Sequence, residues 1–271
     1  MSKKARARLV DILLLAMIIL PFAGAAALKV VTKPPSEEIS ITGAMIYFTI
    51  PMPLQDLPIT EAQVNSLAVM IAILGLCLYL THGITVMPHS KRQLAAEWIV
   101  EKATALVEDN MGKRFLGFAP FVAAIMALSA FSSLSSLLGL FPPTSDMNIV
   151  AGWAILVFIL ITHYKLKGGL LPYVKGFFEP VPIFAPFNII GELATPVSMS
   201  FRHYGNVLSG VVIATLVSYA LQGVSRALLG WLPGALGRFP FLQIGIPAVL
   251  SLYFDWFSSA MQAFIFCMLT M

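Results

Sequence analysis

Six apolar stretches, each long enough to cross a lipid bilayer, constrain this chain more than any other feature of its sequence. A transmembrane helix needs about 20 apolar residues to span a hydrocarbon core of about 30 Å. Hydrophobic residues form 58% of the 271 residues and charged residues only 11%, with a mean hydropathy of +0.87. We therefore expect an all-α membrane protein with about six hydrophobic helices. The stretches are Leu9 to Ala27, Val64 to Leu80, Phe118 to Phe141, Ile149 to Tyr164, Phe187 to Leu221 and Phe239 to Met271.

The basic residues alternate between the connections in the way that sets membrane orientation. Cytoplasmic segments carry an excess of Lys and Arg. Of the 17 basic residues, most fall in the N-terminus and in the segments after the second and fourth stretches. The other connections hold only Lys29, Lys33, Arg226 and Arg238. Both termini are therefore expected on the cytoplasmic side, and Arg202 is the one basic residue left inside an apolar stretch.

The first stretch has two interpretations. Its basic start, its apolar centre and the small residues Ala23 to Ala27 fit either a cleaved signal peptide or a retained signal anchor. Asp11 and Pro21 do not decide between them, and we favour the anchor. We expect residues 1–31 to form an N-terminal signal-anchor or signal-like helix and residues 32–271 to form the membrane domain.

Three connections have characters of their own. Lys29 to Thr60 is an external segment whose five prolines argue against a continuous helix. His89 to Arg114 alternates charged and apolar residues near helical spacing, which predicts an amphipathic cytoplasmic helix on the membrane surface. Its apolar side consists of Leu94, Trp98, Ile99, Ala103, Leu106 and Val107. Lys165 to Pro186 is expected to be a second cytoplasmic interfacial loop.

The last two stretches are too long for an upright helix. Phe187 to Leu221 would extend about 50 Å at 1.5 Å per residue, so it must tilt or kink, and Phe239 to Met271 behaves alike. Pro196, Pro240 and Pro247 are candidate kink points. A strongly tilted antiparallel hairpin would fit both long helices into the hydrocarbon core. If its turn lies near Trp231, Gln262 falls near the level of Arg202, and Asp255 falls about 10 Å further outside.

Arg202 carries a large free-energy cost in this hairpin. An arginine at bilayer depth costs roughly 3 kcal/mol on insertion scales and cannot become neutral by losing its proton. Asn206 and Ser209 follow it at i+4 and i+7, on the same face of a helix. Ser258, Ser259 and Gln262 extend the face of Asp255 in the same way. A buried Asp255 could exchange protons, whereas Arg202 would repel cations. The two polar helix faces therefore suggest an ion path that is interrupted midway.

Structural interpretations compete with this one. Serines in membrane helices often hold helices together, which we favour for Ser198, Ser209, Ser258 and Ser259. Asn206 and Gln262 fit that role and a pathway role equally well. Asp255 could pair with Arg202. Asp146 is expected to cap a helix in the external turn from Pro142 to Asn148.

Several catalytic signatures are missing from the sequence. It has no phosphate-binding glycine loop, no nucleophile elbow and no pair of metal-binding histidines on a helix. No cofactor or metal site is expected, and nothing indicates that the chain breaks bonds alone. Energy coupling would require partners.

Two segments of the hairpin resemble one known family. Pro196 to Asn206 (PVSMSFRHYGN) resembles the arginine helix of F-type ATP synthase subunit a, commonly P-x-S-x-x-x-R-x-x-G-N. Gln262 to Thr270 (QAFIFCMLT) is similar to the signature of its last helix. Pro143 to Asn148, and segments between Phe48 and Pro142, also look like family segments.

The resemblance implies an ion-conducting stator subunit of the Fo sector, in which the helical hairpin 187–271 faces the rotating c-ring. H⁺ or Na⁺ would reach and leave the ring carboxylates through two offset half-channels, coupling ion flow to ATP synthesis. Arg202 would force ion release and block a leak. Asn206, Asp255 and Gln262 would line the external half-channel, Asp146 and Asn148 would lie near its mouth, and Glu192 would lie on the exit path.

The resemblance also implies partners and a location. The partners would be the c-ring, the b subunits of the peripheral stalk and the lipid bilayer, without nucleic acid, in a bacterial cell membrane. The chain departs from the family at Val211, where many members carry Glu or His, so that proton handling falls on Asp255.

Two other classes of function compete with the stator. A self-contained secondary transporter would use Arg202 to bind an anionic substrate. A membrane scaffold would tolerate replacement of Arg202 and Asp255. An intramembrane hydrolase fits least, because no nucleophile and base pair is visible.

Overall fold

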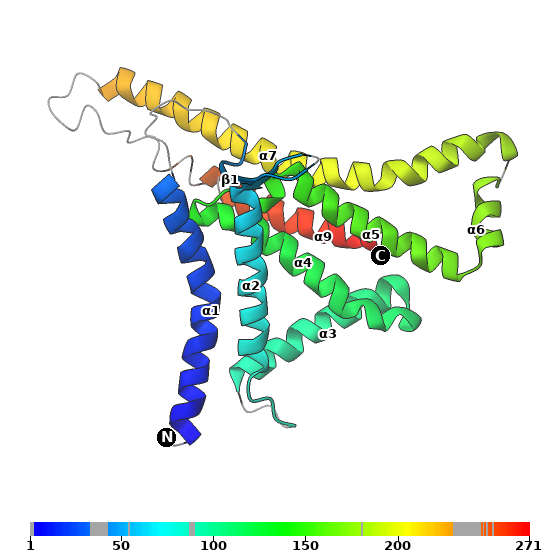
Figure 1. The fold of residues 1–271 in the computed structure, drawn as a ribbon, viewed down its shortest axis with the longest axis horizontal. Coiled ribbons are helices and arrows are strands. Elements are labelled where there is room, and N and C mark those ends of the chain that lie inside the picture. The colour runs from blue at the N-terminus through cyan, green and yellow to red at the C-terminus, as the bar shows by residue number, and fades with distance from the viewer. Residues whose placement is uncertain are drawn as a thin grey trace. The chain divides into compact units, whose positions relative to one another are not determined.

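The computed structural model describes residues 3–32, 43–53, 55–86, 90–179, 181–229, 245, 247, 249–250 and 252–271 (Figure 1). Within these ranges six helices are long and apolar enough to cross a membrane, which confirms the expected all-α membrane fold. The chain divides into two compact units. The first contains residues 1–143, 263–267 and 271, and the second contains residues 144–262 and 268–270.

The first unit contains most of the short elements. Helix α1 spans Lys3–Thr32, strands β1 and β2 span Ile46–Ile50 and Leu57–Thr60, and α2 spans Glu61–Thr81. Helix α3 spans Lys91–Met111, the 3₁₀ helix η1 spans Lys113–Phe118, α4 spans Ala119–Leu134, and η2 spans Ser135–Leu138.

The segment that was expected to be external contains a small antiparallel sheet that the sequence does not predict. Strands β1 and β2 pair from Ile50 opposite Leu57 to Ile46 opposite Thr60. Pro51 and Pro53 lie between the strands, and Pro58 lies in β2 opposite Thr49. A proline cannot donate a ladder hydrogen bond but is tolerated in an edge strand, and both strands of a two-stranded sheet are edges. The prolines exclude a helix here without excluding a sheet.

Helices α1 and α2 lie side by side (Figure 1). The helices approach closely at Gly75, because a Cβ atom placed there would lie 3.2 Å from Ile18 and 3.3 Å from Met17. Ion pairs join α1 to other elements near both of its ends. Lys29 lies 3.1 Å from the Glu61 carboxylate, and Arg92 on α3 lies 2.8 Å from that of Asp11.

The Glu61 carboxylate is the centre of a buried polar junction. Its side chain is 3% exposed, and besides Lys29 it accepts a hydrogen bond from the Phe141 backbone N–H. Lys29 also donates to the Gly139 carbonyl, and Asn65 donates to the Phe141 carbonyl. A buried charge is tolerated only when it is paired and hydrogen-bonded. The junction therefore ties the end of α1 and the start of α2 to the segment that follows η2.

Helix α3 confirms the predicted amphipathic helix, but its apolar side divides into two parts. Ala103 and Val107 are buried, and Val107 packs in a cluster with Ala119 and Val122 of α4 and with Cys267. Leu94, Trp98 and Ile99, nearer the start of the helix, are exposed. Ser90 begins the helix by accepting a hydrogen bond from the Gln93 N–H.

The second unit contains α7, the longest helix of the described residues. Helix α5 spans Met147–Lys167, α6 spans Leu170–Phe177, the 3₁₀ helix η4 spans Pro182–Phe184, and α7 spans Ala185–Leu229. A π-helix, η6, spans Leu252–Ser258 and continues into α9, Ser259–Thr270, whose residues are shared between the units. The segment expected to be a loop, Lys165 to Pro186, therefore contains α6 and η4. The expected turn at Trp231 and the candidate kink at Pro240 lie outside the described residues.

Helix α7 is longer than expected and bends along its length (Figure 1). Its 45 residues would extend about 68 Å if straight, about twice the hydrocarbon core. Pro196 lies inside the helix and removes one backbone donor. The hydroxyl of Ser200 donates to the Pro196 carbonyl at 2.7 Å.

We predict that Lys29→Met destabilises the protein by about 3 kcal/mol, because it leaves the buried Glu61 carboxylate without its counter-ion. The measurement is the thermal unfolding midpoint of the purified complex in detergent. Lys113→Met is the matched control, because Lys113 is 85% exposed and its pair with Glu108 should be worth less than about 1 kcal/mol. Equal midpoints for the two variants would contradict the junction.

Candidate functional site

Arg202 lies on the exposed side of α7. The next residue, His203, is fully buried and packs against Trp153 of α5, with ring centroids 6.3 Å apart. Successive residues of an α-helix point about 100° apart, so Arg202 cannot share that contact. Among the side chains that the structure describes, none forms an ion pair with Arg202. The guanidinium is therefore open to whatever lies beside this face.

The two helices of the expected hairpin meet in antiparallel register. The Asn206 amide donates to the Ser258 hydroxyl at 2.8 Å, and the Ser258 hydroxyl donates back to the Asn206 carbonyl oxygen at 3.0 Å. One turn further along α7, a Cβ atom at Gly210 would lie 3.0 Å from the Cβ of Phe254, one turn back along η6. The same step in the other direction along both helices leads to the level of Arg202 on α7 and of Gln262 on α9. The register expected from a turn near Trp231 is thus supported by the contacts.

The polar residues near this contact have different surroundings. Asn206 and Ser258 join α7 to η6 through their side chains, which is the contact that the helix-to-helix interpretation expects. Gln262 is 5% exposed and lies on α9. Ser209 is exposed.

Asp255 lies within the π-helix, and its side chain lies outside the described residues. The π geometry was not predicted. π-turns are rare and occur frequently at functional sites. The Ser259 hydroxyl donates to the Phe254 carbonyl, five residues earlier, at 3.3 Å. Because the predicted face of Asp255, Ser258 and Ser259 assumed α-helical spacing, that prediction does not carry through this segment.

Asp146 caps helix α5, as expected. Its carboxylate accepts a hydrogen bond from the Asn148 backbone N–H at 2.9 Å. Asn148 itself is exposed. An acidic group at a helix N-terminus also interacts favourably with the helix dipole.

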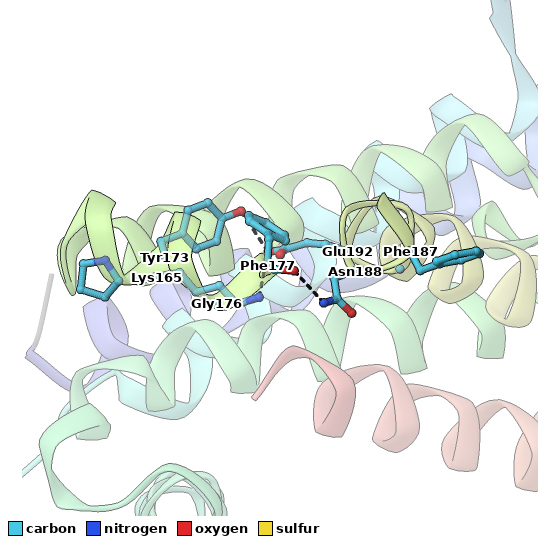
Figure 2. A pocket seen from close by; sticks show the side chains of 9 residues that line it. Lys165, Tyr173, Gly176, Phe177, Phe187, Asn188 and Glu192 are labelled. Carbon is cyan, nitrogen blue, oxygen red and sulfur yellow. Dashed lines mark hydrogen bonds and ion pairs between the residues drawn. The ribbon is translucent and has the colours of Figure 1, made fainter. Parts of the chain in front are cut away.

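Glu192 lines an open pocket of about 440 Å³ between α5, α6 and α7 (Figure 2). Its Oε1 atom lies 2.8 Å from Lys165 Nζ and accepts a hydrogen bond from the Tyr173 hydroxyl at 3.2 Å. Burial raises the pKa of the Tyr173 phenol, and the Glu192 carboxylate raises it further. Tyr173 therefore stays protonated and remains a donor.

The pocket is held together by an amide that links α7 to the end of α6. Asn188 donates to the Phe177 carbonyl at 2.8 Å and to the Glu179 carbonyl at 3.3 Å. The sequence indicates Glu192 as a candidate, but it does not indicate Lys165, Tyr173 and Asn188 as its surroundings. Only the basic end of α5 hinted at them, since a lysine there could reach the start of the next long helix.

Comparison with known proteins identifies the family. The family described as "ATP synthase A chain" matches residues 64–271, more than half of the chain. This chain belongs to the ATP synthase A chain family. Its function is thus that of an ion-conducting stator subunit of ATP synthase, as expected from the motifs of α7 and α9, and not that of a self-contained transporter.

Individual relatives support the same family. ATP synthase subunit a of Moorella thermoacetica is 30% identical over 198 residues, which is 71% of this chain and 90% of the relative. That of Priestia megaterium is 31% identical over 231 residues, 80% of this chain and 92% of the relative. A sodium ion specific subunit a from Propionigenium modestum is 38% identical over 130 residues, 48% of this chain and 38% of the relative.

We predict that Gly210→Val destabilises the protein by about 1–3 kcal/mol through overpacking against Phe254. The matched control is Gly223→Val on the same helix, where an added Cβ would meet nothing within 4 Å. Both variants place a β-branched residue in α7, so the difference between their thermal midpoints isolates the helix contact. Equal midpoints would mean that α7 and η6 do not approach at Gly210.

Proposed function

We propose that this subunit carries ions to and from the c-ring through two half-channels that Arg202 keeps apart. The observation that carries the proposal is the open position of the Arg202 guanidinium on α7. Its neighbour on the helix is buried, while Arg202 itself is exposed and unpaired among the described side chains. A charge left open on a membrane helix needs a partner outside the chain, because its desolvation is otherwise uncompensated.

A carboxylate on the ring would supply that partner. Arginine stays charged under all physiological conditions and binds carboxylates through a rigid fork of donors. An ion-loaded ring carboxylate that reaches Arg202 would release its ion and pair with the guanidinium instead. The same fixed charge would repel any cation that tried to pass directly from one half-channel to the other.

The remaining candidate residues belong to the two half-channels in this proposal. Asn206, Asp255 and Gln262 line the external half-channel, with Asp146 and Asn148 near its mouth. Glu192 lies on the exit path, ten residues before Arg202 on α7. The Asn206–Ser258 bond supports this arrangement by bringing α7 and η6 together on the side of Asn206, one turn from Arg202.

The partners follow from the same arrangement. The hairpin of residues 187–271 would face the c-ring, and the b subunits of the peripheral stalk would hold the chain still. The coupling ion is H⁺ or Na⁺, since one relative is described as sodium ion specific. Each ion that crosses a potential of about 100 mV delivers roughly 2.3 kcal/mol, so a leak past Arg202 would dissipate the gradient.

We predict that Arg202→Ala abolishes ion-driven ATP synthesis in membrane vesicles that contain the whole complex. Arg226→Ala is the matched control, because Arg226 is an exposed arginine in the last turn of the same helix. Asp255→Asn should slow coupled transport while ATP hydrolysis by the detached catalytic head continues. Normal synthesis in the Arg202→Ala complex would refute the proposal.

We further propose that residues 1–31 are retained as a membrane helix in a bacterial cell membrane, with both termini in the cytoplasm. The ion pairs of Lys29 and Asp11, together with the contact at Gly75, support retention, because cleavage would leave the buried Glu61 without a counter-ion.

We predict that the chain purified from membranes has the mass of the uncleaved sequence. An N-terminal epitope should be digested by protease in inverted vesicles and protected in right-side-out vesicles. A mass short of residues 1–31 would contradict retention.

A further inference from the structure

The Glu192 carboxylate is already occupied in the structure. Its Oε1 atom receives both the Lys165 ammonium, at 2.8 Å, and the Tyr173 hydroxyl, at 3.2 Å (Figure 2). The Glu192 side chain is only 16% exposed, whereas that of Lys165 is 48% exposed. A nearly buried carboxylate is thus bound by a cation that remains in contact with water.

The two partners of Glu192 differ in how easily they can leave. Tyr173 is fixed by its packing against Phe177, with ring centroids 5.0 Å apart. Lys165 lies in the last turn of α5, on a flexible four-carbon side chain. A half-exposed ion pair of this kind is worth at most about 1 kcal/mol, so thermal motion separates it readily. Lys165 is therefore the mobile partner.

We propose that Lys165 is a tethered cation that binds Glu192 between passing ions and competes with the transported H⁺ or Na⁺ for its carboxylate. The proposal rests on Glu192 lying on the exit path. When a proton binds Glu192, the carboxylate loses its charge and the ammonium withdraws to water. When the proton leaves to water, the carboxylate is charged again and Lys165 returns to it.

The composition of the pocket supports competition for one carboxylate. Of the nine residues that line the pocket, the titratable ones are Lys165 on α5, Tyr173 on α6 and Glu192 on α7. Phe177 and Phe187 also line the pocket, and their uncharged side chains cannot neutralise an ionised Glu192. Among the described side chains, an ionised Glu192 without Lys165 would keep only the Tyr173 hydroxyl as a partner, and an arriving cation would meet no competitor.

Competition has a signature in ATP-driven pumping, where ions enter from the side of this pocket. Removing a competitor lowers the ion concentration that gives half-maximal rate, whereas removing a structural contact lowers the rate itself. We predict that Lys165→Met lowers the half-saturating ion concentration by about two- to fivefold, the range expected for a partly exposed ion pair. Lys165→Arg, which keeps the charge, should stay close to the wild type.

The experiment uses inverted vesicles that contain the whole complex. ATP-driven proton uptake is measured by fluorescence quenching against the external pH, or uptake of radioactive Na⁺ against external NaCl if pumping requires Na⁺. The matched control is Lys167→Met, because Lys167 lies in the same turn of α5, over the ring of Tyr164 at 5.0 Å. Lys165→Gln repeats the test with a polar side chain if Lys165→Met reduces the amount of assembled complex.

Two results would overturn the competition. One is an unchanged half-saturating concentration with a lower maximal rate in both Lys165 variants that lack the charge, which would make Lys165 a structural pin between α5 and α7. The other is wild-type pumping by Glu192→Gln, which would remove Glu192 from the path. Neither result touches the role of Arg202, which the Arg202→Ala complex tests separately.

Discussion

The cost of a charge without a partner in apolar surroundings determines how this chain is organised. Three pairs of opposite charges lie between described helices: Lys29 beside Glu61, Arg92 beside Asp11, and Lys165 beside Glu192. Each pair joins elements that are distant in the sequence, so the same contacts that neutralise charge also fix the fold. Arg202 differs from them because no described side chain forms an ion pair with it, and in our proposal its partner is a carboxylate of the c-ring.

The long helix α7 carries several of the residues that the proposed mechanism uses. It carries Glu192, Arg202 and Asn206 along one continuous element, so their spacing is set by helical rise and not by loop conformation. It contacts α5 at His203, α6 at Glu192 and η6 at Asn206. The bend within α7 lets such a long helix follow its neighbours. A site built on packed helices keeps its geometry more precisely than one built on loops.

The membrane-spanning helices and the charged residue inside an apolar stretch were predictable from the sequence. The partners of the buried carboxylates were not. Hydrophobic length predicted the spans, and a lone arginine in an apolar run identified Arg202 without any contact being known. The antiparallel register followed from the assumption of a short turn, and it agrees with the Asn206–Ser258 and Gly210–Phe254 contacts. The partners of Glu61 and Glu192 were not predictable, because several basic residues could have reached each carboxylate. The π-helix at Asp255 was equally hidden, since one extra residue per turn leaves no periodic trace in seven residues.

The junction at Glu61 has a consequence for how the subunit could change through evolution. The family match begins at residue 64, so α1 and the small sheet lie before it, while Asn65 and Phe141 lie inside it. Glu61 lies just before the matched range, and its carboxylate is contacted by Lys29 from outside that range and by the Phe141 N–H from inside it. A descendant that lost α1 would inherit a buried acid with no base beside it, and would have to replace Glu61 or recruit a new cation. The helix and the acid are thereby linked, because the loss of α1 would remove the counter-ion of Glu61.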